Sequence, residues 1–139
     1  MSDNLFTELL REAAHRSSPV IRVEYFIDSD LPRRPVAIGI SFRDGALYVL
    51  AQGDDDSINI ADSIPKELRR DLTVIDVSYS NSWRRVIEAK LIWGWLLTNH
   101  QGYTDGAQLE FRGESSGDTS CVQVLVIAST LEVRTVLLP

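Results

Sequence analysis

Apolar and polar residues alternate one by one along several stretches of this chain, and this period of two constrains the fold more than any other feature of the sequence. The pattern covers residues 21–28 and returns in residues 38–51 and 73–79. Successive side chains of a strand point to opposite faces, so the pattern is typical of strands with one buried face. In the first stretch, the residues expected to face inward are Ile21, Val23, Tyr25 and Ile27.

A hairpin is predicted around Asp44 and Gly45, which stand between two of the alternating apolar runs. Asp-Gly is typical of a two-residue type I′ turn, in which both central residues have positive φ. Such a turn would pair Phe42 with Leu47. The six residues then expected on the core face are Ile38, Ile40, Phe42, Leu47, Val49 and Ala51.

Helical spacing of apolar residues predicts an amphipathic helix over residues 3–16, with His15 facing solvent. A short internal helix is expected near Ser63–Asp71, where Pro65 suits a first helical turn. Further strands are predicted at residues 58–60, 108–112, 120–128 and 133–138, with 113–118 as a hairpin loop. Residues 83–98 are compatible with a helix or a strand, and we choose strand for 90–98 because Gly94 disfavours a helix interior. We therefore expect one α+β domain over residues 1–139, mainly antiparallel β-sheet with an N-terminal amphipathic helix and one short internal helix.

The charge balance excludes some classes of partner. The net charge is −6, and neither half of the chain is basic, so nucleic-acid binding is not expected. The longest apolar stretch is too short to span a bilayer, and acidic Asp3 and Glu8 stand where a signal peptide would be basic. We expect a cytoplasmic protein with no membrane contact. Its negative charge either simply favours solubility or suits a basic protein partner.

The acidic run Asp54, Asp55 and Asp56 is the first candidate site. Clustered carboxylates are the ligands that calcium or magnesium prefers, but neither EF-hand register that starts in this run puts glycine and glutamate at the required positions. Two interpretations stay open: a solvated turn between strands, or a contact patch for a basic partner. No metal is expected.

The second candidate site is the loop that follows residue 98. Its candidate partner-binding or ligand-binding residues are Asn99, His100, Gln101, Tyr103 and Asp105. Histidine transfers protons near neutral pH, and Asp105 could orient His100. The spacing matches no known nucleophile or metal motif, and two histidines exclude a multi-histidine metal site in one chain. We assign no catalytic residue and no cofactor, and the loop is either a hydrogen-bonded connection, a binding surface or a catalytic site.

Cysteine and tryptophan complete the candidates. The single cysteine, Cys121, cannot form an internal disulfide and is expected to be a small buried hydrophobe. Trp93 and Trp95 are two residues apart, so on a strand they share a face. We expect that face to pack in the core; exposed, it would form a binding or homodimer surface.

The block from Trp83 to Phe111 resembles the signature of a family of small bacterial proteins classed as a domain of unknown function. Within it, W-x-W at residues 93–95 is followed by T-N-x-Q-G-Y-x-D-G at residues 98–106. The resemblance implies a bacterial cytoplasmic protein and supplies no catalytic residue. The function hypothesis is a non-enzymatic interaction or accessory protein, of an immunity type that binds a basic partner. The alternative is a small-molecule-binding domain or hydrolase that uses His100, Tyr103 and Asp105.

Overall fold

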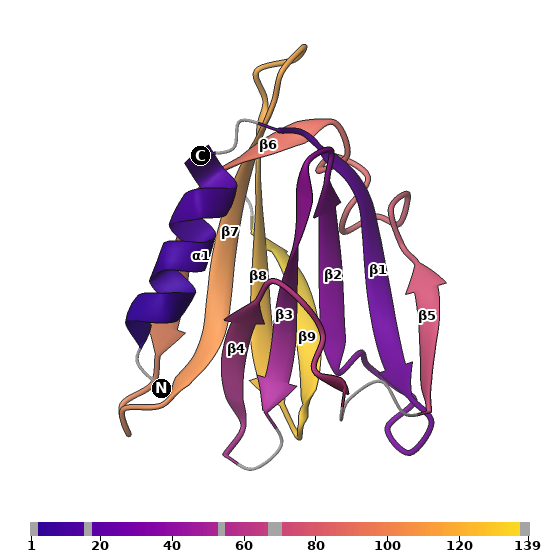
Figure 1. The fold of residues 1–139 in the computed structure, drawn as a ribbon, viewed down its shortest axis with the longest axis vertical. Coiled ribbons are helices and arrows are strands. Elements are labelled where there is room, and N and C mark those ends of the chain that lie inside the picture. Colours follow the sequence, from indigo (N-terminus) through magenta and orange to yellow (C-terminus); the bar gives the residue numbers. More distant parts are fainter. Residues whose placement is uncertain (1–2, 16–17, 53–54, 67–70, 137–139) are drawn as a thin grey trace.

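The computed structural model describes residues 3–15, 18–52, 55–66 and 71–136 (Figure 1). In these residues one helix, α1 (Asp3–His15), precedes nine strands. The strands are β1 (Val20–Asp28), β2 (Ala37–Phe42), β3 (Gly45–Gln52), β4 (Ser57–Ala61), β5 (Leu72–Asp76), β6 (Ala89–Thr98), β7 (Thr104–Gly113), β8 (Thr119–Ile127) and β9 (Thr130–Val136).

The strands form two antiparallel sheets that pack against each other. One sheet has the order β4-β3-β2-β1-β5 and the other the order β6-β7-β8-β9. The expected α+β class with two helices is therefore wrong, because the described residues form mostly antiparallel sheet with one helix. The expected internal helix near Ser63–Asp71 falls partly on residues 67–70, which lie outside the described residues; 63–65 are not helical, and Lys66 alone is in 3₁₀ conformation. Two facing sheets bury each other's apolar sides, so period-two segments can complete the core without a second helix.

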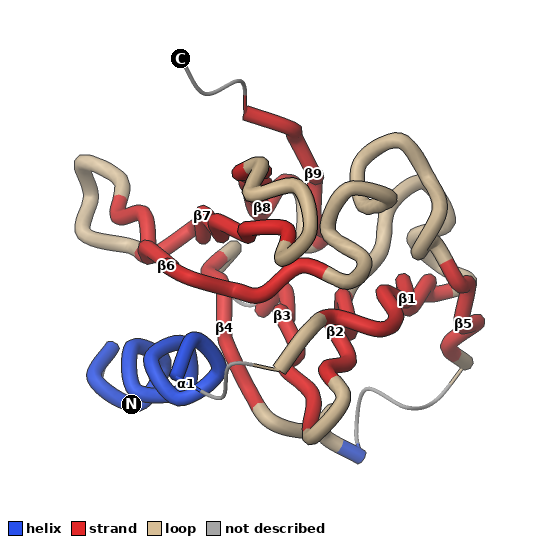
Figure 2. The backbone as a smooth tube through the Cα atoms, turned by 90° about the horizontal axis from the view of Figure 1, so that it is seen from above, coloured by secondary structure: helices blue, strands red, loops and turns tan. Residues whose placement is uncertain are grey.

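The N-terminal helix is confirmed, and it lies beside the sheets rather than across their outer faces. Leu10 and Ala13 are buried, while Arg11 and His15 are exposed as an amphipathic helix requires. Helix α1 packs against β6 and β4. Seen from above in Figure 2, it lies at the end of the structure near β4 and β6, and β5 lies at the opposite end.

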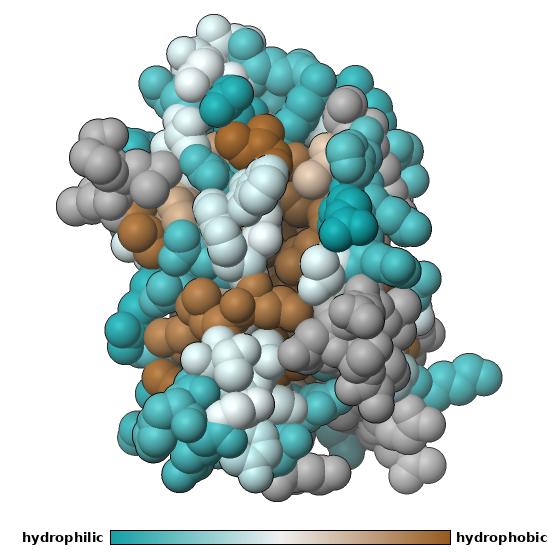
Figure 3. All heavy atoms as spheres, turned by 90° about the vertical axis from the view of Figure 1, so that its left-hand side faces the viewer, coloured by the Kyte–Doolittle hydropathy of each residue, from teal (hydrophilic) through white to brown (hydrophobic). Residues whose placement is uncertain are grey.

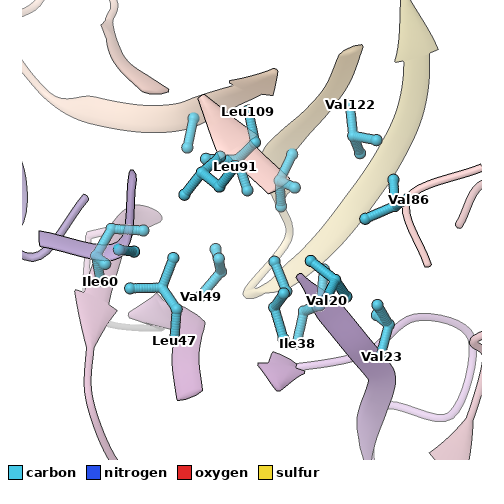
Figure 4. Packing of buried hydrophobic residues seen from close by; sticks show 14 of the residues in the cluster. Val20, Val23, Ile38, Leu47, Val49, Ile60, Val86, Leu91, Leu109 and Val122 are labelled. Carbon is cyan, nitrogen blue, oxygen red and sulfur yellow. The ribbon is translucent and has the colours of Figure 1, made fainter. Parts of the chain in front are cut away.

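The core lies between the two sheets. Figure 4 shows Leu91 and Leu109 of one sheet across from Val49 of the other, and all three are at most 2% exposed. Trp83, from the segment between β5 and β6, is fully buried, and its Nε1–H donates a hydrogen bond of 2.7 Å to the Tyr25 hydroxyl. The indole thus connects the segment that precedes β6 to β1 in the other sheet.

The hairpin of β2 and β3 is confirmed, but its turn and register differ from the prediction. Phe42 pairs with Gly45, so Arg43 and Asp44 occupy the turn. Gly45 does not have positive φ, so the predicted type I′ turn is wrong. The Arg43 N–H donates to the Pro19 carbonyl (3.1 Å), which holds the turn against the chain that enters β1. The two registers differ by two residues, so the same six side chains still face the core.

Irregular pairing changes which residues of two strands face inward. In β1 the register shifts between Val20 and Arg22, and Ile21 is 44% exposed although alternation predicts it inside. In β6 the register shifts between Leu91 and Trp93. A β-bulge inserts one residue and so reverses the alternation of faces beyond it. The expected strand over 73–79 is shorter than predicted, because β5 ends at Asp76 and Tyr79 beyond it is 81% exposed.

Candidate functional site

Asn99 organises the β6–β7 loop, the second site predicted from the sequence. Its side-chain Oδ1 accepts hydrogen bonds from the backbone N–H groups of Gln101 (2.9 Å) and Tyr103 (3.2 Å). Its Nδ2 donates to the Asp105 carboxylate (3.2 Å), and its backbone N–H donates to the Tyr103 carbonyl (2.9 Å). Gly102 completes the loop with φ of 89°, a left-handed conformation that glycine adopts without steric penalty.

The remaining side chains of this loop point to solvent or to the loop itself. His100 and Gln101 are exposed, Tyr103 is 47% exposed, and Asp105 is half-buried beside Asn99. Within the described residues, no hydrogen bond or ion pair joins His100 to Asp105. The structure brings Asn99 and Asp105 together and leaves His100 apart from them.

The acidic run of the first predicted site connects loops at one end of the sheets. Asp54 lies outside the described residues. The Asp55 carboxylate accepts hydrogen bonds from the Ser57 N–H (3.1 Å) and hydroxyl (2.6 Å). The Asp56 carboxylate accepts a hydrogen bond of 2.9 Å from the Ser129 N–H, in the β8–β9 turn. Both carboxylates therefore hold backbone turns in place while they stay exposed.

The two neighbouring tryptophans of β6 are exposed, so the expectation that they pack in the core is wrong. Trp93 is 57% exposed and Trp95 is 42% exposed. Their ring centroids lie 6.0 Å apart and their planes are tilted by 54°. The physical reason is the irregularity between Leu91 and Trp93, which leaves Leu91 inside and turns both indoles outward.

The indoles belong to an outer sheet surface that spans β6 to β9. Directly paired residues of neighbouring strands share a face. The pairing gives three outward rows: Trp93, Glu110, Cys121 and Val136; Trp95, Gln108, Gln123 and Arg134; Leu97, Gly106, Leu125 and Glu132. We define the aromatic face as Trp93, Trp95, Leu97, Gln108 and Glu110. Lys90 and Arg112 pair with each other one step beyond Trp93 at the border of this face, where Lys90 forms an ion pair with Glu114.

Cys121 lies in this outer face but is buried, at 1% exposure, as the sequence predicted. Burial raises the pKa of its thiol, and the nearby Glu110 carboxylate raises it further. Thiolate is the reactive form of cysteine, so this environment suits an inert thiol. In the described part of the chain, no cluster of three histidine, cysteine or acidic side chains could hold a metal ion.

Three surface pockets lie at different places on the molecule. The largest, of about 690 Å³, lies between the segment before β6 and the β7–β8 loop, and its lining includes bases such as Arg84 and Arg85 and acids such as Glu88 and Glu114. Another, of about 350 Å³, lies beside residues 30–34. A third, of about 370 Å³, lies between α1 and β6. None of the described residues of the acidic run or of the β6–β7 loop lines any of the three, but Trp93 lines the third.

Apolar side chains reach the surface on the side of the molecule where α1 meets the sheets. Figure 3 looks at the left-hand side of Figure 1, and brown apolar residues lie in the middle of this side among polar ones. Sequence reasoning missed the α1–β6 pocket because its two walls are far apart in the chain. One usable signal was Gly94 in the middle of an aromatic strand, because a glycine in a strand often marks a bulge or a close approach of another element.

Comparisons with known proteins bear on identity but not on activity. No curated protein and no solved structure matches the chain. No helix in the described residues has the length and apolar character that crossing a membrane requires. A family described as a family of unknown function, DUF6334, matches residues 1–137, which confirms the resemblance to a domain of unknown function. The chain therefore belongs to the family of unknown function DUF6334.

Proposed function

We propose that this chain is a non-enzymatic interaction protein, of an accessory or immunity type, that binds a basic protein partner through the aromatic face. One observation carries the proposal: two neighbouring tryptophans of β6, beyond the irregularity after Leu91, are 57% and 42% exposed. Exposed indoles are large apolar surfaces, and tryptophan is enriched among the residues that dominate binding energy at interfaces.

The chemistry of the aromatic face supports a cationic partner side chain. The negative face of an indole ring attracts the charge of lysine or arginine, most strongly for tryptophan. Glu110 lies directly across from Trp93, so a cation on that ring has a carboxylate beside it. The net charge of −6 would also speed the approach of a basic partner.

The spacing of the two indoles supports an extended partner segment. Residues two apart on a strand point the same way and lie about 7 Å apart. An extended peptide with a basic residue at every second position therefore presents its cations at the spacing of Trp93 and Trp95. The exposed carboxylates of Asp55 and Asp56 offer a second, weaker site for the same class of partner.

The alternative, a small-molecule-binding domain or a hydrolase centred on His100, Tyr103 and Asp105, receives less support. Asn99 engages the Asp105 carboxylate, and His100 stands apart from it. From the sequence resemblance we also propose a bacterial origin and a cytoplasmic location.

The proposal is tested with a defined peptide. A fluorescein-labelled (Arg-Thr)₄ peptide is titrated with the protein at low salt, and (Glu-Thr)₄ serves as the charge-reversed probe. A cation–π contact at an exposed site contributes about 0.5–1 kcal/mol. We therefore expect Trp95→Ala to weaken (Arg-Thr)₄ binding about twofold to fivefold, with a similar loss for Trp93→Ala and a smaller one for Glu110→Gln.

Matched controls separate the aromatic face from general attraction to an acidic protein. Tyr79→Ala removes an aromatic residue elsewhere that is even more exposed, at 81%, and should leave binding unchanged. Asp55→Asn removes an exposed charge at the other candidate site. The proposal fails if (Glu-Thr)₄ binds as tightly as (Arg-Thr)₄, or if Asp55→Asn weakens binding while Trp95→Ala does not.

A further inference from the structure

The pocket between α1 and β6 combines an apolar floor with basic side chains. Its helix wall is formed by residues three or four positions apart, and its strand wall by three consecutive residues. The lining residues are Thr7, Leu10, Arg11, Ala14, His15, Ile92, Trp93 and Gly94. Its volume of about 370 Å³ lies in the range of small-molecule sites.

Local irregularity in β6 creates the pocket. The register shift between Leu91 and Trp93 turns the Trp93 indole outward, where it becomes a wall. Gly94 then faces α1, and a Cβ at this position would lie 3.3 Å from both methyl groups of Leu10. Helix α1 therefore contacts the strand backbone at Leu10, and the pocket opens beside this contact.

The charge of the lining is opposite to that of the protein. Among the described residues that line the pocket, Arg11 and His15 are basic and none is acidic. The chain as a whole carries six more acidic than basic residues. Acidic neighbours on the helix, Glu8 and Glu12, are exposed and do not line the pocket. An anionic group is the ligand chemistry that complements this lining.

The same two bases also have a structural use. Basic side chains in the last turns of a helix offset the negative end of its dipole. That use requires no apolar floor and no aromatic wall, both of which this pocket has. Leu10 and Ala14 offer apolar surface, and Trp93 offers a ring for stacking. An apolar, planar body attached to an anion would contact all of these groups at once.

We propose that the α1–β6 pocket binds a small aromatic carboxylate. The aromatic body lies against Trp93 over the apolar floor, and the carboxylate accepts hydrogen bonds from Arg11 and His15. This inference shares Trp93 with the peptide-binding proposal. It does not use Trp95 or Glu110, so Trp95→Ala and Arg11→Gln test the two proposals separately. The site is a binding site, and no bond is made or broken in it.

The test uses 1-naphthoate as the ligand and 1-naphthamide as an uncharged ligand of almost the same shape. Binding is followed by NMR through the three indole N–H signals of ¹⁵N-labelled protein, assigned with Trp93→Phe and Trp95→Phe. We expect 1-naphthoate to shift the Trp93 signal saturably and to leave the signal of buried Trp83 unchanged. The amide should bind more weakly by about fivefold, because it lacks the charge that pairs with Arg11 at this partly exposed site.

Two variants test the pocket itself. Arg11→Gln should weaken 1-naphthoate binding about fivefold with little effect on the amide. Ala14→Leu fills the pocket with a strong helix former and should abolish the Trp93 shift for both ligands. Arg43→Gln removes an exposed arginine from the β2–β3 turn and serves as the matched control, with unchanged binding.

Three results would overturn the inference. The first is the absence of a saturable Trp93 shift with millimolar 1-naphthoate. The second is equal affinity for acid and amide, which would make the pocket merely apolar. The third is an Arg11→Gln variant that binds 1-naphthoate like the wild type but melts at a lower temperature, which would limit Arg11 to offsetting the helix dipole.

Discussion

Replacing Trp83 with phenylalanine tests how the segment before β6 is attached to the other sheet. Trp83 is fully buried, and its indole N–H donates to the Tyr25 hydroxyl at 2.7 Å. Truncating a buried aromatic residue to alanine costs about 3–5 kcal/mol. Phenylalanine keeps a six-membered ring, so we take about half of that loss, roughly 2 kcal/mol. The lost hydrogen bond adds about 1 kcal/mol.

The expected total is a loss of roughly 3 kcal/mol in the free energy of unfolding, measured by urea denaturation. At about 3 °C per kcal/mol for a domain of this size, the melting temperature should fall by roughly 9 °C. A double-mutant cycle with Tyr25→Phe isolates the hydrogen bond. Its expected coupling energy is about 1 kcal/mol, and additive effects within about 0.3 kcal/mol would refute the assigned contact.

The remaining predictions concern a strained turn and alkaline pH. Ala128 and Ser129 have φ of 50° and 67° in the two-residue β8–β9 turn, a conformation that Asn and Gly adopt more readily. The double variant Ala128→Asn with Ser129→Gly should therefore raise the free energy of unfolding by about 1 kcal/mol in urea denaturation. A lower free energy of unfolding would contradict this. Burial raises the pKa of Tyr25, and the Trp83 hydrogen bond opposes the shift only in part. The folded chain thus holds the phenolic proton more tightly than the unfolded chain. The contribution of Tyr25 to the free energy of unfolding is therefore complete below pH about 10, and it is lost as the pH rises through the folded pKa. In denaturation series across that range Tyr25→Phe should lose less stability than the wild type, and equal losses would refute the link.

The sequence by itself determined the strands, the helix and many inward faces. The apolar, aromatic run around Gly94 predicted a strand over residues 90–98, where β6 forms. Period-two patterning is a local property, so it predicted the core side of the β2–β3 hairpin. It could not select the hairpin register, because registers two residues apart bury the same side chains. The observed register is accompanied by a distant contact, the hydrogen bond from the Arg43 N–H to the Pro19 carbonyl. The same locality explains the wrong fold class, since the arrangement of two facing sheets depends on contacts between distant segments.

Tertiary structure alone decided the candidate sites. Strict alternation puts Leu91, Trp93 and Trp95 on one face, and that face would be the core. The irregularity after Leu91 reverses the alternation, so the indoles face solvent and Gly94 faces Leu10 of α1. This choice depends on the energy of packing a helix against a strand more than seventy residues away, which no local pattern encodes. The β6–β7 loop was predicted as a candidate site from its sequence. Only the folded loop revealed that Asn99 donates a hydrogen bond to the Asp105 carboxylate, which was expected to orient His100.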